Sequence, residues 1–412
     1  MKNNIWNRQY AKFSAYGFLK NLRFFDAFFI LFLVEKGLPY TQIGILYAAR
    51  EIIINLFEVP SGVIADMYGR KISLIGSFLF YIISFIVFYL SSNFWWFLAA
   101  FLLYGIADAF RSGTHKGMIM DYLKLNDWQD QKINYYGHTR AWSQKGSALS
   151  SIVAGAVVFY SGSYQSIFLY SIVPYLLNLL LIISYPNELN LSQKKNKKKD
   201  IALTLSSFFN IIKQPKVLGL INASAVHSAF LKAVKDYIQP LMVSVALLIP
   251  VLTNVEIEKK NGIFIGLIYF LIYIASSRAS QLASKVASKN KSRISHQTLI
   301  WGFLFGIGCG VFYYFDLPFI ALLAFIGIYI IENMRKPILT GFVADNVPNE
   351  LLVSVISVQS LIRTIITAII AVVFGVIADK VGIGLSFILV SSALLLTTIM
   401  VDIYIKNKSS ND

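Results

Sequence analysis

The sequence contains a single cysteine, Cys309, and it lies within an apolar run. One cysteine excludes an internal disulfide framework, a Cys-x-x-Cys metal site and a paired-cysteine redox centre. Cys309 itself is expected to be a small buried apolar residue. The sequence motifs of zinc peptidases, serine hydrolases and Walker-type ATPases are absent as well. We therefore expect no enzyme activity, no cofactor and no bound metal.

Charged residues are also scarce, at 14% of the 412 residues, and the acidic ones are the scarcer sign. The chain has 21 Asp and Glu against 37 Lys and Arg, which gives a net charge of +16. Hydrophobic residues make up 56% of the chain, and the mean hydropathy is +0.62. A soluble protein cannot bury so much apolar surface, so the composition predicts a membrane protein. The basic residues lie between long apolar runs and do not form a basic patch on a solvent-exposed surface. This distribution argues against nucleic-acid binding.

Apolar runs of membrane-spanning length fill most of the chain. A bilayer core about 30 Å thick needs about 20 apolar residues per helix, and breaks rich in Gly, Pro, Ser and Asn separate the runs. We expect twelve transmembrane helices at 12–35, 41–65, 72–91, 94–122, 133–160, 163–185, 216–249, 261–284, 295–315, 317–345, 351–378 and 383–405.

Lysine and arginine are concentrated in alternate loops, and the polar segment 186–215 contains the run Lys194-Lys195-Asn196-Lys197-Lys198-Lys199. The positive-inside rule then predicts a protein of the cytoplasmic membrane with both termini in the cytoplasm. The same segment divides the spans six and six. This predicts a bundle over 1–185, a cytoplasmic basic linker over 186–215 and a second bundle over 216–412. We interpret the lysine run as a topology signal in preference to a specific lipid site.

The two halves show a weak internal repeat. An offset of 220 residues aligns Lys116 with Lys336, Gly155 with Gly375, and Gly162 with Gly382. Parallel six-helix halves of this kind build one large class of secondary transporters.

A longer motif lies between the second and third expected spans. Its residues are Gly62-Val63-Ile64-Ala65-Asp66-Met67-Tyr68-Gly69-Arg70-Lys71. It closely resembles the major facilitator superfamily signature G-x-x-x-D-R/K-x-G-R/K-R/K and departs from it only at Met67. The resemblance implies an all-α membrane fold of twelve helices in two pseudo-symmetric six-helix bundles. It also implies a gating role for this loop, with the following residues: Gly62, Asp66, Gly69, Arg70 and Lys71.

Traces of the motif recur in the second half of the sequence. The Gly-x-x-x-Asp pattern reappears at Gly375 to Asp379. The second-half segment that corresponds to the first motif, around Ser284 to Lys289, keeps basic charge but lacks the Asp-x-x-Gly core. This departure argues against a symmetrical gate.

Ionisable residues inside the expected spans are candidate functional residues because charge is costly in a bilayer. The acids are Asp26, Glu51, Glu58, Asp108, Asp236 and Glu332. The bases are Lys20, Arg23, Arg50, Arg111, Lys116, Arg140, Lys145, Lys232, Lys235, Arg335, Lys336 and Arg363. Bases outnumber acids, so several cations are left without an acidic partner, and an anionic substrate would neutralise them.

The resemblance places the first, fourth, seventh and tenth helices around a central cavity. The candidate substrate-binding residues are Arg23, Arg111, His115, Lys235, Asn333, Arg335, Lys336 and Arg363. The candidate coupling residues are Asp26, Asp108, Asp236 and Glu332, with protons or sodium as the coupling ion.

Purely structural interpretations remain open for several of these residues. Arg23 with Asp26, and Asp108 with Arg111, are spaced as internal pairs on a helix face. Lys20 and Lys116 could reach the membrane interface. His115 and His227 are candidates either for proton transfer or for structural hydrogen bonds.

We expect a secondary transporter for a small anionic solute, working as a monomer by alternating access. The alternatives are a proton-coupled efflux pump for amphipathic drugs and a membrane receptor or sensor on a transporter scaffold. A pocket for cationic drugs would favour acids over bases, and the sequence shows the reverse. The glycine-rich G-P-x-x-G-G stretch usual in the fifth helix of drug antiporters of the family is also replaced here by Ser150-Ser151-Ile152-Val153-Ala154-Gly155.

Overall fold

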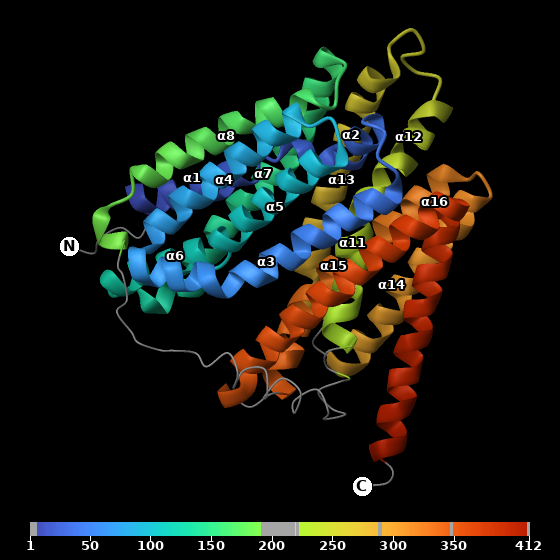
Figure 1. Cartoon of the computed structure of the whole chain (residues 1–412). Coiled ribbons are helices and arrows are strands. Elements are labelled where there is room, and N and C mark those ends of the chain that lie inside the picture. The colour runs from blue at the N-terminus through green and yellow to red at the C-terminus, as the bar shows by residue number, and fades with distance from the viewer. Residues whose placement is uncertain (1–5, 191–218, 220–221, 287–290, 347–348, 410–412) are drawn as a thin grey trace. The chain divides into compact units, whose positions relative to one another are not determined.

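The computed structural model describes residues 6–190, 219, 222–286, 291–346 and 349–409 (Figure 1). The lysine run and most of the expected linker 186–215 lie outside these residues. Every regular element in the described ranges is helical, and no strand occurs in them.

The first half of the chain supplies these helices: α1 (Arg8–Lys20), α2 (Phe29–Glu35), α3 (Tyr40–Tyr68), α4 (Arg70–Leu90), α5 (Phe94–Arg111), α6 (Thr114–Leu125), α7 (Lys132–Ser161) and α8 (Ser166–Ile183). The second half supplies these: α11 (His227–Val234), α12 (Ile238–Leu248), α13 (Ile257–Val286), α14 (Lys291–Tyr314), α15 (Pro318–Asn346) and α16 (Asn349–Ser409). Short turns of other helix types are η1 (Phe24–Ala27), η2 (Gln129–Gln131), η3 (Asn187–Leu189), the π-helical η4 (Asn222–Val226) and η5 (Lys235–Tyr237).

The described helices carry the features of membrane spans. Seven helical stretches among the described residues are long and apolar enough to cross a membrane. Large apolar side chains such as Leu90, Leu180 and Ile369 are more than half exposed, as expected for residues that face lipid. Trp95 and Trp96 are exposed at the start of α5, a position typical of aromatic residues at a membrane interface. Cys309 is fully buried, as the sequence predicts.

Most predicted spans correspond closely to single helices, but three of them are interrupted within their length. The span 12–35 is broken into α1, η1 and α2. The span 94–122 is interrupted at Ser112 and Gly113, and the span 216–249 at η5. Hydropathy reports apolar length and cannot detect such breaks. The expected spans 351–378 and 383–405 are joined in α16, whose backbone leaves helical geometry at Gly382.

The chain forms two compact units. Unit 1 contains residues 1–38, 49–195 and 249–273, and unit 2 contains residues 39–48, 196–248 and 274–412. The helices α3 and α13 are therefore each divided between the units. The expected boundaries followed the order of the sequence, whereas these units follow spatial contacts.

Unit 1 has an aromatic core. Within it, α4 packs against α5 and α8, and α1 packs against α7 and α8. Phe29 stacks on Phe101 with ring centroids 5.2 Å apart, and Phe88 stacks on Phe168 at 4.9 Å. Packed rings of this kind exclude water and hold the helices that carry the polar residues described below. In unit 2, α14 packs against α15 and α16, and α11 packs against α16.

The glycines aligned by the 220-residue offset occupy matching situations. A Cβ atom on Gly155 would lie 2.5 Å from the Gly262 carbonyl oxygen, and one on Gly375 would lie 2.3 Å from that of Tyr40. Both positions therefore allow two helices to approach closely. Gly162 and Gly382 both have positive φ, at 64° and 86°, which suits the turn that each makes.

Candidate functional site

Three polar helix segments meet at one place in unit 1. Lys20 is the last residue of α1, and Arg111 is the last residue of α5. The break after Arg111 includes Gly113, whose φ of 74° lets the chain turn before α6 begins. Along α7, Tyr136, Arg140 and Ser147 recur at helical spacing and so share one face.

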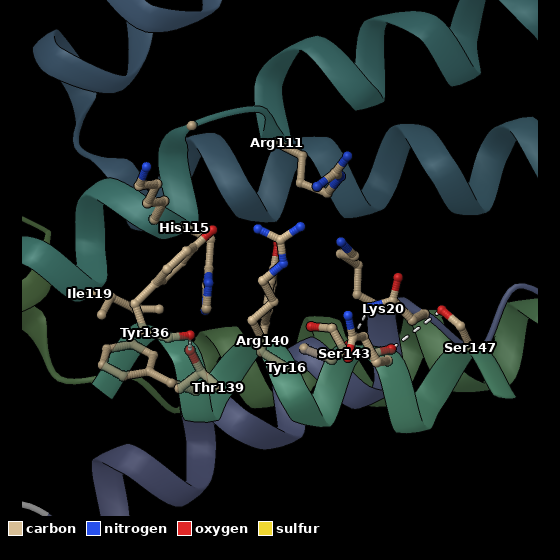
Figure 2. A pocket seen from close by; sticks show the side chains of 16 residues that line it. Tyr16, Lys20, Arg111, His115, Ile119, Tyr136, Thr139, Arg140, Ser143 and Ser147 are labelled. Atoms are coloured by element: carbon tan, nitrogen blue, oxygen red, sulfur yellow. Dashed lines mark hydrogen bonds between the residues drawn. The ribbon is translucent and has the colours of Figure 1, made fainter. Parts of the chain in front are cut away.

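These segments enclose a pocket of about 370 Å³ within unit 1 (Figure 2). Its sixteen lining residues include four cations and no aspartate or glutamate. They are Phe13, Tyr16, Gly17, Lys20, Asn21, Arg111, Gly113, His115, Lys116, Ile119, Tyr136, Thr139, Arg140, Ser143, Gln144 and Ser147. The volume lies toward the lower end of the range for small-molecule sites, about 300–1,000 Å³.

Arg111 is held at the pocket by a carboxylate and a phenol. Its Nη2 atom lies 2.8 Å from Asp108 Oδ1, and its Nε atom donates to the Tyr81 hydroxyl at 2.9 Å. Tyr81 in turn donates a short hydrogen bond to Asp108. The expected spacing of Asp108 and Arg111 thus produces an internal pair, and Arg111 also faces the pocket. The internal pair is therefore confirmed, whereas a substrate-binding role of Arg111 stays a prediction.

The remaining cations of the pocket lack such a partner. No ion pair of the described residues includes Lys20, Lys116 or Arg140. The side chains of Lys20, Arg111 and Arg140 point toward one another across the pocket in Figure 2. Lys116 lies 5.4 Å from the centroid of the Tyr136 ring, a cation–π contact. The wall is therefore strongly electropositive.

An aromatic stack forms another wall of the pocket. The rings of Tyr16 and His115 are stacked with centroids 3.5 Å apart, and Phe13 meets His115 edge-on at 5.4 Å. The Nε2 atom of His115 lies 3.3 Å from the Tyr185 hydroxyl. These contacts fix the His115 ring in place, which favours a structural and lining role for it.

A smaller cavity of about 100 Å³ in unit 1 contains the other predicted pair of the first span. Arg23 Nη1 lies 3.5 Å from Asp26 Oδ2, and both residues line this cavity. The two cavities share Asn21 and Ser147 as lining residues. Arg23 and Asp26 lie in and beside the turn η1, not on the continuous helix expected from the sequence.

The predicted site residues of unit 2 are engaged in internal contacts. His227 Nδ1 lies 2.7 Å from Glu332 Oε2, and Ser228 donates a short hydrogen bond to the same carboxylate. Both members of the pair are buried. Gly302 makes room for the histidine, because a Cβ atom there would lie 2.1 Å from His227 Nε2.

Arg335 is only 1% exposed, and main-chain oxygens satisfy much of its guanidinium. Its Nη1 atom donates to the Ser295 carbonyl at 2.5 Å and to the Thr298 hydroxyl at 2.7 Å. Its Nη2 atom donates a short hydrogen bond to the Ala223 carbonyl. This arrangement favours a structural role for Arg335 over direct contact with a substrate.

The other predicted residues of unit 2 are placed as follows. Lys235 Nζ lies 3.4 Å from Asp236 Oδ1, and Asp236 accepts a hydrogen bond from the Tyr47 hydroxyl at 3.0 Å. Asn333 donates to the Tyr329 carbonyl of its own helix at 2.9 Å. Arg363 and Lys336 are exposed on α16 and α15.

The first motif, Gly62 to Lys71, joins α3 to α4. Arg70 Nη1 lies 3.2 Å from Asp121 Oδ2 on α6. The Lys71 ammonium donates to the Tyr185 carbonyl at 2.7 Å. Gly62 and Asp66 are exposed, and no described residue pairs with the Asp66 carboxylate. Gly62 makes no close helix contact, because a Cβ atom there would meet no heavy atom within 4 Å.

The second motif, Gly375 to Gly382, lies in α16 and contacts the start of α3. The Asp379 carboxylate accepts the Tyr40 amide at 2.8 Å and the Thr41 amide at 2.7 Å. These are the first amides of α3, so Asp379 caps that helix from a distant part of the chain.

Sequence reasoning missed several residues of the cation-lined pocket. Lys20, Lys116 and Arg140 are among the candidate intramembrane bases, but the sequence assigns Arg140 no role and leaves an interfacial position open for Lys20 and Lys116. The small hydroxyls of Thr139, Ser143 and Ser147 were not noticed. The polar stripe on α7 that includes Arg140 was the available signal, because it repeats at helical spacing.

Comparisons with known proteins agree with this architecture. Residues 19–371 match the Major Facilitator Superfamily. The uncharacterized MFS-type transporter YxaM of Bacillus subtilis (strain 168) is 23% identical over 413 residues, covering 94% of this chain and 93% of the relative.

Solved structures show the same fold at low sequence identity. The nucleoside transporter NupG has a TM-score of 0.75 at 13% identity, with 96% of this chain and 99% of that chain covered. A POT family transporter in complex with 5-aminolevulinic acid has a TM-score of 0.73 at 11% identity, with 97% and 96% covered. The fold and the match over most of the sequence together show that this chain belongs to the Major Facilitator Superfamily of secondary transporters.

Proposed function

We propose that this transporter carries a small organic anion and binds it in the cation-lined pocket of unit 1. The observation that carries the proposal is the charge of the wall: four cations and no carboxylate line about 370 Å³. Buried or partly buried cations are unfavourable in a membrane protein unless an anion neutralises them. A nucleoside or a cationic drug would leave that charge uncompensated.

Proteins of similar structure transport or bind other kinds of solute, which must also be tested. The structural neighbours include a nucleoside transporter and a transporter in complex with 5-aminolevulinic acid. A nucleoside is uncharged, and 5-aminolevulinic acid carries both an amine and a carboxylate. Efflux of cationic amphipathic compounds fits the pocket least, because its lining has no acid to attract them.

Transport by the purified protein in proteoliposomes tests the proposal. Uptake of a labelled organic anion is expected, with little uptake of an uncharged nucleoside or a cationic dye. The Arg140→Gln variant should raise the KM for the anion about 10- to 100-fold, because it removes a charge-assisted interaction of about 1.5–3 kcal/mol. Lys259→Gln is the control, since Lys259 pairs with Glu256 outside the pocket. Unchanged anion uptake in both Arg140→Gln and Arg111→Gln would overturn the assignment, and binding without transport would favour a receptor.

For coupling, we propose that the His227–Glu332 pair carries the proton. Each of the other candidate acids pairs with an arginine or lysine, and the basic partner stays positively charged near neutral pH. These acids are Asp26, Asp108 and Asp236. Glu332 faces a histidine, which can lose its charge near neutral pH. Arg335 and Lys336 are the further charged neighbours of His227.

A Glu332→Gln variant separates coupling from binding. Accumulation driven by a proton gradient should be lost, whereas exchange of labelled for unlabelled solute at equal pH should persist. Asp26→Asn is the matched control in unit 1. Accumulation that survives in Glu332→Gln would contradict the coupling role and would leave the anion site unaffected.

We further propose alternating access as the mechanism and the first motif as part of its gate. The lysine and arginine distribution supports a location in the cytoplasmic membrane with both termini in the cytoplasm, and we propose that the protein works as a monomer. Cysteine labelling from either side of the membrane at Ser409 and Lys36 would check this topology.

A further inference from the structure

The charge balance of the pocket distinguishes between classes of anion. Lys20, Arg111, Lys116 and Arg140 line the pocket, and Asp108 offsets Arg111 from behind the wall. Three of the four cations are therefore left without a carboxylate among the described residues. A ligand with one negative charge would leave most of this positive charge in place, whereas a doubly charged ligand would remove more of it.

The geometry of the cations favours one compact charged group. Lys20, Arg111 and Arg140 come from α1, α5 and α7, and their ends converge on the same part of the pocket (Figure 2). Like charges repel when no anion separates them, and the charged groups that act on Lys20 are three cations, Arg111, Arg23 and Arg140, against one carboxylate, Asp108. Donors that converge from three directions surround a tetrahedral oxyanion better than a planar carboxylate. Guanidinium groups in particular match the oxygens of a phosphate.

The start of α6 adds a further positive contribution. Gly113 lines the pocket and precedes α6, and no side chain caps this helix end. The first turn of a helix presents amide groups without partners in the same helix, together with the positive end of the helix dipole. Helix starts of this kind commonly bind phosphate groups.

Tyr16 places a buried hydroxyl beside the cations of the pocket. Its side chain is only 3% exposed and lines the pocket. Its hydroxyl lies beside the Arg111 guanidinium, which can only donate, and no described residue accepts the hydroxyl proton. Such a group is costly unless a ligand or water accepts its hydrogen bond.

We propose that the pocket recognises a phosphate monoester, with the doubly charged phosphate between Lys20, Arg111 and Arg140. The organic part of the ester lies against the Tyr16–His115 stack, and the hydroxyls of α7 supply hydrogen bonds. The proposal rests on the anion-transport function proposed above and narrows it to one class of anion.

Binding to the full-length protein in detergent tests this charge preference. The probes are phenyl phosphate, phenyl sulfate, benzoate, inorganic phosphate and uncharged adenosine, each titrated at pH 8 by calorimetry. Phenyl phosphate should bind at least about tenfold more tightly than phenyl sulfate, which has the same shape but one negative charge fewer. Tighter binding of phenyl phosphate than of inorganic phosphate would support contact between the organic group of the ester and the Tyr16–His115 stack. The preference should fall when the pH drops below about 6, where a phosphate monoester gains a proton.

Two variants separate the charge preference from folding. Lys20→Gln and Arg140→Gln should each reduce the preference for phenyl phosphate over phenyl sulfate by about tenfold. Lys20→Gln should not lower the melting temperature of the ligand-free protein, because it removes a repulsive charge. Lys259→Gln should retain the full preference.

The outcomes distinguish this proposal from the broader one. Equal binding of phenyl sulfate, benzoate and phenyl phosphate would overturn the phosphate proposal and leave an anion transporter. A phosphate preference that survives in both variants would overturn the assignment to this pocket. Binding of adenosine with no binding of any anion would overturn both proposals.

Discussion

Two copies of one sequence pattern, the first motif at Gly62 to Lys71 and the second at Gly375 to Gly382, share a local structure and differ in their partners. Each begins with Gly-x-x-x-Asp and has a further glycine seven positions after the first. The final glycines have nearly the same backbone, with φ and ψ of 97° and 147° at Gly69 and of 86° and 165° at Gly382. This conformation is essentially restricted to glycine.

The aspartates of the two motifs differ completely in their contacts. Asp379 accepts two amides at the start of α3, whereas no described residue pairs with Asp66. The first glycines differ in the same way, since Gly375 contacts the main chain of α3 and Gly62 has open space beside it. The comparison teaches that the pattern specifies the turn, and that a neighbouring helix decides whether the glycine and the aspartate are used.

The largest difference between the motifs is expected for alanine at the first glycine. Gly375→Ala should destabilise the protein by about 1–3 kcal/mol, because the new Cβ would collide with the Tyr40 main chain. Gly62→Ala should instead stabilise it by up to about 1 kcal/mol through helix propensity. Unfolding in mixed micelles with increasing SDS, followed by tryptophan fluorescence, measures both. Equal effects of the two substitutions would show that the packing difference is unimportant.

A smaller difference is expected at the aspartates. Asp379→Ala should cost about 0.5–2 kcal/mol, the usual range for removing a helix N-cap. Asp66→Ala should change stability by less than about 0.5 kcal/mol, as surface substitutions do. Hydrogen exchange at the amides of Tyr40 and Thr41 should become faster in the first variant only. Protection of these amides that survives in Asp379→Ala would contradict the cap.

The smallest difference in stability is expected for alanine at the final glycines. Here the substitution in the first motif, and not that in the second, is expected to be the more destabilising. Both Gly69→Ala and Gly382→Ala force alanine into a backbone conformation that costs about 1–3 kcal/mol. Gly69→Ala should be worse by up to about 1 kcal/mol, since the Asn190 side chain lies against Gly69 and holds the Lys71 amide at 3.1 Å. Adding Asn190→Ala should remove the extra loss. A double variant no better than Gly69→Ala would place the strain elsewhere.

Much of the fold could be predicted from apolar length alone. Helices such as α4, α7 and α8 lie close to the predicted spans 72–91, 133–160 and 163–185. The breaks before Arg23, after Arg111 and at Lys235 could not be predicted in this way. Polar residues interrupt these spans only briefly, and hydropathy averages over such a short interruption.

The candidate site was predicted in part. Arg111 and His115 were selected as ionisable residues within an expected cavity-lining span, and both line the cation-lined pocket. Arg335 met the same criterion, yet its guanidinium donates to the Ser295 and Ala223 carbonyls. Lys20 and Arg140 line the pocket without having been selected. A sequence identifies charged residues within spans, but it does not show which of them face a cavity.

The sequence by itself determined that this protein crosses the membrane many times, that it carries more basic than acidic residues within its spans, and that it resembles the major facilitator superfamily. Composition and local motifs suffice for these conclusions because each depends on residues near one another in the chain. Only the tertiary structure decided that Lys20, Arg111 and Arg140 converge on one pocket, whereas Arg335 donates to main-chain carbonyls. It also decided that Asp379 caps α3, whereas no described residue pairs with the Asp66 carboxylate. The physical reason is that the energy of a buried charge or an uncapped helix end depends on atoms supplied by other helices.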